Sequence, residues 1–135
     1  MRKRALFITG LIFFFSAALI SAEGEWKELK SSHFIIYYDE APRGFVDNVQ
    51  EAAERYYTEI LEDLGFQRYK VWSFDERAKI YIYNDKNDYI EKGQMSGWSH
   101  GSAQSRTKEI RTFPSSHGFF DSVLPHELTH IIFRE

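Results

Sequence analysis

The strongest constraint on this fold is a short run near the end of the sequence, where two histidines flank a glutamate with the spacing H-E-x-x-H. The three residues are His126, Glu127 and His130. Apolar residues around them recur with the period of one α-helical face: Leu124, Leu128, Ile131 and Ile132. On a helical wheel His126 and His130 lie about 200° and 240° around the axis from Leu124. The segment is therefore predicted to be a helix that packs on a core through one face and presents both histidines on the other.

The same spacing is typical of a metal site. Residues four apart on a helix differ by about 40° around its axis, so the imidazoles of His126 and His130 point the same way and can hold one ion. Glu127 stands about 100° from His126, beside that ion. The chain contains no Cys, which excludes thiolate ligands and disulfides. We therefore predict a zinc site in which all the protein ligands are histidines and carboxylates.

Pro125 restricts where the helix begins. Proline lacks the N–H group that a helix interior needs, so the helix should start within about one turn of it. Asp121 or Ser122 is predicted to cap that start. The apolar pattern then continues to Glu135 without a Gly, Asn or Pro to end the helix, and we expect the sequence to be part of a longer chain.

Residues 1–22 have the three parts of a secretory signal peptide. A basic start precedes an apolar run over residues 5–20, which is shorter than the roughly 20 residues that span a bilayer. Cleavage is predicted after Ala22, which places residues 23–135 in a secreted, periplasmic or cell-envelope protein. The alternative is an uncleaved segment that keeps the protein attached to a membrane.

The charge of the mature segment argues against nucleic acid as a partner. Removing residues 1–22 takes away three of the 17 basic residues and none of the 20 acidic ones, which leaves a formal charge of −6. The remaining 113 of the 135 residues suffice for one modest domain.

Alternating strand and helix patterns organise the first part of this domain. Residues 33–38 are β-branched and aromatic on both faces, which predicts a strand covered on both sides. Residues 42–64 keep helical spacing of apolar positions, with Gly65 as the stop. Residues 79–83 alternate and predict a second strand.

The rest of the domain is predicted to end in an edge strand and the H-E-x-x-H helix. Residues 86–92 fit a short helix closed by Gly93, and residues 97–102 read as a loop. The polar residues 103–113 allow a strand whose charges suit a sheet edge. This order predicts an α+β fold with a mixed sheet, in which a peptide can add to the edge strand beside the metal.

Two segments resemble a known family. The string from Leu124 to His130, preceded far upstream by the aromatic strand at residues 32–38, is similar to the peptidase MA-like group of gluzincin metallopeptidases. The resemblance covers most of the mature segment and is specific only at the active helix. It implies a zincin-like fold that hydrolyses peptide or protein substrates.

The resemblance also implies the roles of the motif residues. His126 and His130 ligate zinc, and Glu127 is the catalytic residue that acts on the attacking water. The family's third ligand is a glutamate on a later helix. Glu135 cannot replace it, because it sits about 140° from His130 on the same helix. Phe133 stands where the alternative metzincin pattern requires Gly. The chain is therefore expected to be the N-terminal part of a gluzincin catalytic domain.

Other interpretations stay open at this point. The chain is either the zinc peptidase described above, a non-catalytic extracytoplasmic binding or assembly module derived from the same fold, or an extracytoplasmic domain whose motif is coincidental. His33 is expected to be structural or solvated, and His100 and His117 are placed in loops. Trp98 either lines a substrate pocket or, more commonly for a single aromatic residue, serves in packing.

Overall fold

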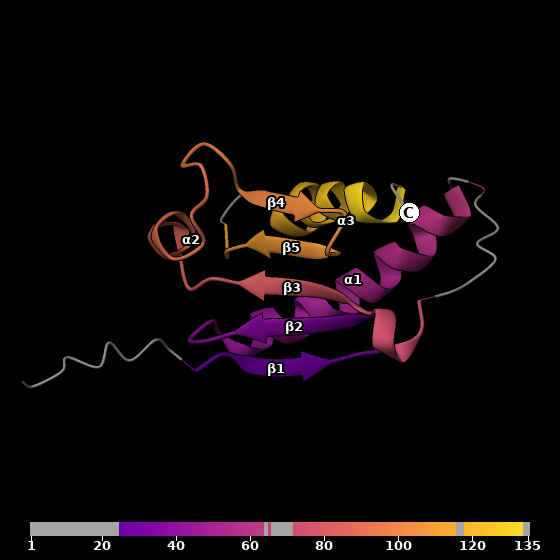
Figure 1. Cartoon of the computed structure of the whole chain (residues 1–135), viewed down its shortest axis with the longest axis horizontal. Coiled ribbons are helices and arrows are strands. Elements are labelled where there is room, and N and C mark those ends of the chain that lie inside the picture. The colour runs from indigo at the N-terminus through magenta and orange to yellow at the C-terminus, as the bar shows by residue number, and fades with distance from the viewer. Residues whose placement is uncertain (1–24, 64, 66–71, 116–117, 134–135) are drawn as a thin grey trace, which may run out of the picture.

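The protein is a mixed α+β domain, seen here in a computed structural model that describes residues 25–63, 65, 72–115 and 118–133. Five strands form one mixed sheet with three α-helices around it (Figure 1). In chain order the elements are β1 (Lys27–Lys30), β2 (Phe34–Tyr38), α1 (Arg43–Asp63), a 3₁₀ turn η1 (Phe74–Glu76), β3 (Ala78–Ile82), α2 (Lys86–Glu91), β4 (Gly101–Gln104), β5 (Glu109–Thr112), a π-helical turn η2 (Phe119–Val123) and α3 (Leu124–Phe133). The predicted α+β class is confirmed.

The sheet runs in the order β1-β2-β3-β5-β4, with parallel strands in the middle and antiparallel strands at both edges. β2 and β3 are parallel, as are β3 and β5, and each crossover between them carries a helix. The two edge strands pair with their neighbours through hairpins. A peptide-sized partner can therefore reach the sheet at β1 or at β4, and only β4 adjoins α3.

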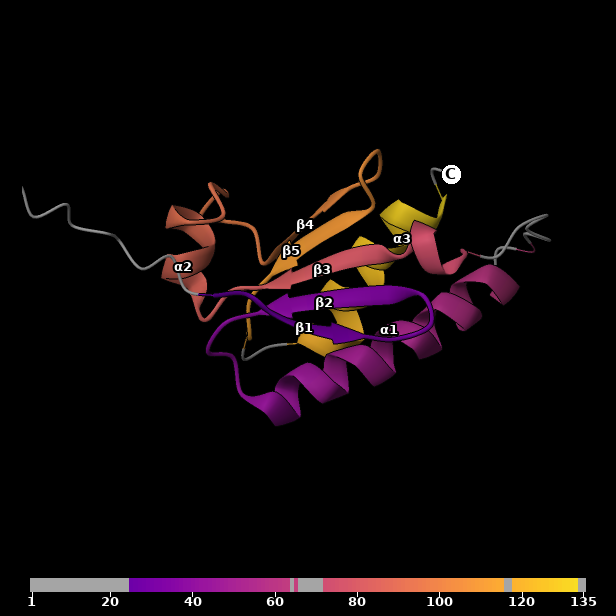
Figure 2. The same ribbon diagram turned by 60° about the horizontal axis from the view of Figure 1, so that its bottom comes forward.

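Alternation along the strands places the core on one face of the sheet. The helices α1 and α3 pack against that face and against each other (Figure 2). The core is built from strand and helix residues that are almost fully buried, among them Phe34, Ile36, Val49, Ala53, Ile80, Ile82, Ile110, Leu128 and Ile131. Burial of this apolar surface is the main contribution that stabilises the layers.

The opposite face of the sheet differs from the sequence prediction. The strand at residues 33–38 was expected to be covered on both sides, but α1 and α3 cover only one side. On the other side Ile35 and Tyr37 are half-buried, and Tyr37 stacks on Tyr81 of β3 with ring centroids 4.9 Å apart. Aromatic neighbours thus shelter these side chains in place of a helix.

The predicted single strand at residues 103–113 is a hairpin, and this prediction was wrong. β4 and β5 pair in antiparallel fashion across a turn at residues 105–108, so β5 is interior and β4 is the edge. The turn uses Lys108 with φ near 51°. It contains no Gly, Asn or Pro, so the sequence carried no turn signal there. β4 also begins at Gly101, inside the loop expected at residues 97–102.

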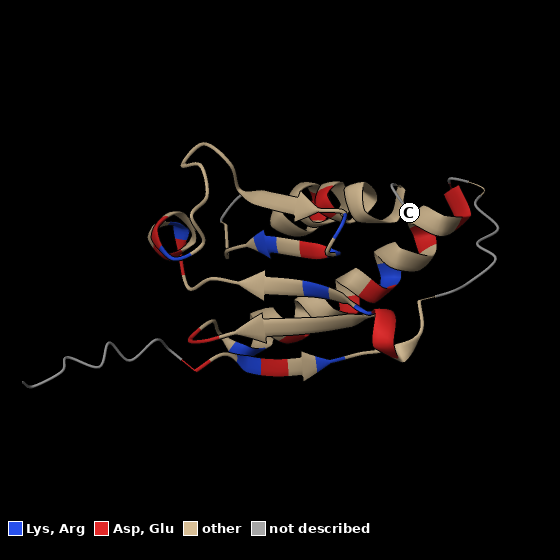
Figure 3. Cartoon of the chain, in the orientation of Figure 1, with Lys and Arg blue, Asp and Glu red and all other residues tan. Residues whose placement is uncertain are grey.

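The charged edge strand β1 was not predicted at all. Its sequence, Lys27–Lys30, contains one apolar residue, Leu29, which lies beside Ile36 in the register with β2. Charge on an edge strand discourages pairing with other chains. Figure 3 shows these charges along β1, in contrast to β2 and β4, which carry none.

The predicted signal peptide, residues 1–22, lies outside the described residues. Among the residues that the structure does describe, no helix is long and apolar enough to cross a membrane.

Candidate metal centre

The predicted helical stripe is confirmed, and it sets the orientation of the motif. Leu124, Leu128, Ile131 and Ile132 are at most 3% exposed and pack into the core, whereas His126 and His130 are exposed. Because burial of the apolar residues fixes the rotation of α3 about its axis, the two histidines lie on the solvent-exposed side of the helix.

The two imidazoles converge on one point in front of the helix. Their Nε2 atoms are 3.1 Å apart, and the rings stand nearly perpendicular to each other. Two nitrogen ligands at the usual distance from a tetrahedral zinc ion are separated by about 3.3 Å. The donor pair therefore fits two positions of a zinc site with almost no rearrangement, provided that neither Nε2 carries a proton.

Glu127 lies between the two histidines in sequence but, unlike them, is buried. It is 9% exposed, and burial raises the pKa of its carboxyl group above the usual 4.5, while the charges of His126 and His130 oppose that shift only in part. A carboxyl group with a raised pKa is a better proton acceptor, which suits a general base more than a metal ligand.

Gly101 lets the edge strand approach this carboxyl group closely. A Cβ atom at position 101 would lie 3.0 Å from Cγ of Glu127, 3.1 Å from its Oε1, and 3.0 Å from Cγ1 of Val123. Contacts this close are tighter than most that real Cβ atoms make, so a side chain here would push Glu127 or Val123 aside by a few tenths of an ångström. Glycine at this position therefore allows β4 and α3 to hold the Glu127 side chain between them.

The start of α3 differs from the prediction. Asp121 and Ser122 do not cap it, because they lie inside the π-helical turn η2, which begins after Gly118 and continues into α3. The amide of Val123 donates to the carbonyl of Gly118, five residues back. Such a wide turn relieves the clash between the Pro125 ring and the carbonyl four residues before it.

A contact from α1 holds this turn in place. The hydroxyl of Tyr56 donates a hydrogen bond of 2.8 Å to the carbonyl of Phe120. Phe45, also on α1, packs against the rings of Phe119 and Phe120. The start of α3 is thus held in place by side chains of α1.

A pocket of about 450 Å³ opens in front of the motif. Its walls come from α3, from the hairpin of β4 and from the loop between α2 and β4: Tyr89, Met95, Ser96, Trp98, Ser99, Gly101, Ser102, Ala103, Ser105, His126, Glu127 and His130. Ser105, in the hairpin turn, donates to the carbonyl of His130 at 3.1 Å and ties the hairpin to the helix. An edge strand does lie beside the motif, but it is β4 and not the single strand predicted at residues 103–113.

The pairing of β5 shows which backbone groups of β4 face outward. Lys79 and Tyr83 donate to the carbonyls of Lys108 and Thr112, so even-numbered residues of β5 point toward β3 and odd-numbered ones toward β4. In the register of the hairpin, Ser102 and Gln104 therefore bond to β5. Gly101 and Ala103 keep their N–H and C=O groups on the free edge.

Ser99 occupies part of this edge. Its hydroxyl donates to the carbonyl of Gly101 and accepts from the amide of Gly101 at 3.3 Å. The hydroxyl of Tyr89 lies 3.3 Å away and fixes the position of Ser99. Of the outward-facing groups on β4, only those of Ala103 remain available to a second strand.

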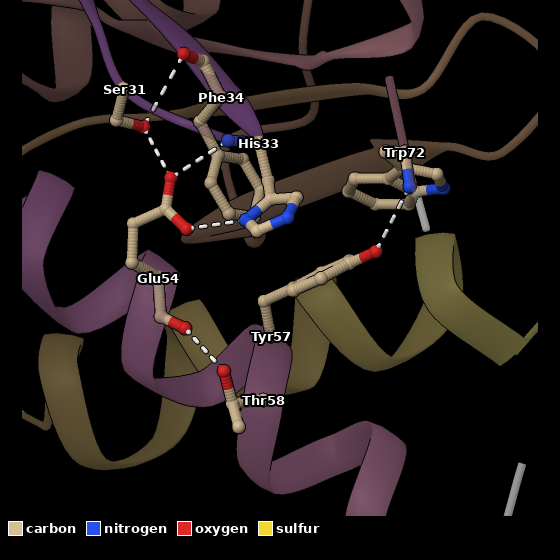
Figure 4. A network of polar contacts seen from close by, with 7 residues as sticks. All are labelled: Ser31, His33, Phe34, Glu54, Tyr57, Thr58 and Trp72. Atoms are coloured by element: carbon tan, nitrogen blue, oxygen red, sulfur yellow. Dashed lines mark hydrogen bonds and ion pairs between the residues drawn. The ribbon is translucent and has the colours of Figure 1, made fainter. Parts of the chain in front are cut away.

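The other predicted histidines do not join the site. His33 belongs to a separate network beneath β2, where Glu54 accepts from Ser31 Oγ, from the His33 amide and from His33 Nδ1 at 2.6–2.8 Å (Figure 4). The His33 ring stacks on Tyr57, 4.2 Å between centroids. Its expected structural role is confirmed. His100 is exposed at the start of β4, and His117 lies outside the described residues.

Within the described ranges, no group of three His, Cys, Asp or Glu side chains is arranged to hold a metal ion. His126 and His130 supply two ligands, and the donor set needs a third from elsewhere.

Gly101, Ser99 and Tyr56 contribute to the site but were not predicted from the sequence. Their contributions depend on contacts between distant segments, for which a single sequence has no local signal.

No protein-family model matches the chain, and no curated protein matches it either.

Proposed function

We propose that this chain belongs to the catalytic domain of a secreted or cell-envelope zinc peptidase of the gluzincin type, with a zincin-like fold. One observation carries the proposal: two imidazole Nε2 atoms stand 3.1 Å apart on the exposed face of a buried helix, beside a buried glutamate and an open edge strand. A solvated helix would need neither the convergence of the rings nor the buried carboxyl group.

Each residue of the motif has a separate task. His126 and His130 would hold a zinc ion through Nε2, and a third ligand would come from residues outside the described part of the chain. Zinc, when bound, supplies a Lewis acid that polarises the substrate carbonyl and makes water a stronger nucleophile. Glu127 accepts a proton from the water as its oxygen attacks the carbonyl carbon, and returns the proton to the nitrogen as the C–N bond breaks.

The free edge of β4 orients the substrate. A peptide in extended conformation pairs with the N–H and C=O groups of Ala103 and becomes an additional strand of the sheet. The pocket in front of α3 then receives the scissile bond beside Glu127. Fixing the peptide backbone in this way lowers the entropic cost of reaching the transition state.

The test separates metal binding from catalysis in the complete natural protein. Replacing His126 with Ala should abolish stoichiometric zinc, measured by elemental analysis. Replacing Glu127 with Gln should leave zinc in place and reduce hydrolysis of a peptide library, followed by mass spectrometry, by about 10²–10⁴-fold. The matched control is His100→Ala, because His100 is exposed and outside the pocket.

Two outcomes would count against the proposal. Full activity in Glu127→Gln would remove the assigned base, and absence of zinc from the wild-type protein would remove the metal site. A wild-type protein that holds zinc and binds peptides without cleaving them would identify a non-catalytic binding module instead.

A further inference from the structure

Trp98 is the most exposed large apolar residue in the described part of the chain. Its side chain is 86% exposed, yet it lines the pocket in front of the metal-binding helix. Among the described residues it has no ring contact and no hydrogen bond, in contrast to Trp26, which packs edge-on against Tyr81 and Tyr83. An indole left open to water beside a candidate active site is available to bind a ligand.

The loop that carries Trp98 is fixed at both ends relative to β4. Met95 Sδ lies 3.2 Å from Ser102 Oγ, and Ser99 is bonded to Gly101 and Tyr89 as described above. Gly97 packs closely as well, since a Cβ there would lie 3.3 Å from Ile90 Cδ1. Trp98 is therefore held between two anchored points, next to the start of the edge strand.

The register of β4 indicates which substrate residue meets this loop. A peptide residue paired with Ala103 sends its side chain to the face of the sheet that α3 covers, since Ala103 shares that face with Ile110. The neighbouring peptide residue points to the opposite face. That face carries Ser102, whose side chain contacts Met95.

We propose that Trp98 and Met95 form a subsite that binds a bulky apolar side chain of the peptide, on a residue next to the one paired with Ala103. This inference rests on the proposed function, because it names the substrate class of the same pocket. The two side chains offer an apolar surface and no charge, so the subsite favours Phe or Leu and disfavours Asp.

Binding of peptides to the zinc-loaded Glu127→Gln protein tests the subsite without any turnover. The probes are capped hexapeptides that are identical except for one position, which carries Phe, Leu, Ala or Asp. The Phe and Leu peptides should bind about tenfold to a hundredfold more tightly than the Ala peptide. In the additional variant Trp98→Ala this difference should disappear, whereas Trp98→Phe should retain most of it.

Phe74→Ala is the matched control, because Phe74 is also exposed, at 76%, but lies on η1 and outside the pocket. It should leave the preference unchanged. Equal affinities for all four peptides, or an unchanged preference in Trp98→Ala, would overturn the subsite. A preference that depends on Trp98 in a protein whose wild type cleaves nothing would support the subsite and contradict the peptidase.

Discussion

At the scale of single residues, Gly101 and Glu127 show how closely the site depends on one missing atom. The edge strand lies close against the Glu127 carboxyl group at position 101, where an added Cβ atom would stand 3.0 Å from Cγ and 3.1 Å from Oε1 of that residue. The neighbouring positions on β4 carry Ser and Ala, so the requirement is specific to the point where the strand crosses Glu127 and Val123.

We expect Gly101→Ala to lower peptide hydrolysis by about tenfold to a hundredfold, because the added methyl group displaces the Glu127 carboxyl from its position. Zinc content should not change, since neither histidine is touched. Gly44→Ala is the control, because nothing lies within 4 Å of a Cβ at that position. If Gly101→Ala and Gly44→Ala hydrolyse peptides at the same rate, the close contact between position 101 and Glu127 does not affect activity.

A second residue-scale prediction concerns Glu54. Burial acts to raise the pKa of this carboxyl group, but hydrogen bonds from Ser31 and His33 outweigh it and hold the pKa below the usual 4.5. Because the folded pKa is lowered, the stability that it contributes is complete above about pH 4.5 and is lost as pH falls through the folded value.

Glu54→Gln should therefore lower the free energy of unfolding by about 1–3 kcal/mol at pH 7, because the amide and ring of His33 lose their charged acceptor. Urea denaturation of both proteins over a pH series measures the effect. The gap between them should narrow as pH falls below 4.5. A difference in the free energy of unfolding that does not change with pH would show that the charge of Glu54 is not the cause.

The residue-scale predictions from sequence had uneven success. The orientation of His126, Glu127 and His130 followed from helical periodicity, because one local pattern determines both the buried and the exposed face. The sequence predicted Gly101 to lie in a loop. The role of Gly101 depends on its contact with Glu127, which lies on a helix more than twenty residues later in the chain.

At the scale of elements, the π-helical turn before α3 depends on a contact with α1. The hydroxyl of Tyr56 reaches the carbonyl of Phe120, which lies in that turn. The sequence predicted a simple capped start, because capping residues and proline were both present. The π-helical turn that precedes α3 carries no such local signal and is seen only together with the packing of α1.

Tyr56→Phe should lower the free energy of unfolding by about 1 kcal/mol through loss of this hydrogen bond. Amide hydrogen exchange at the start of α3 should accelerate more than exchange in β3. The control is Tyr81→Phe, because the Tyr81 hydroxyl has no hydrogen bond to any of the described residues. Equal exchange rates at the start of α3 in both variants would show that Tyr56 does not hold the turn.

At the scale of the whole molecule, the sheet is sealed on one face and open on the other. β3 illustrates the difference, because Ile80 is fully buried under the helices while its neighbour in sequence, Lys79, lies on the open face and is half-buried. The order of strands and helices from residue 33 to α2 was predicted well. The prediction from sequence failed for the charged strand β1 and for the β4–β5 hairpin. The positions of these strands depend on the strands they pair with more than on their own residues.

Ile80→Ala should lower the free energy of unfolding by about 2–5 kcal/mol, because it leaves a cavity in the larger hydrophobic cluster, under α1 and α3. Ile35→Ala, on the open face of β2, should cost about 1 kcal/mol. Denaturation by urea compares the two. Equal losses would mean that the open face is covered as fully as the other.

The hydroxyl of Ser99 also bears on solubility. An uncharged edge strand with free backbone groups invites like chains to stack onto it, and β4 contains neither Lys nor Pro to discourage them. By bonding to the backbone groups of Gly101, Ser99 shortens the stretch of this edge onto which a like chain could pair. An open stretch of this length would limit pairing between like chains and still accept the short peptide proposed above.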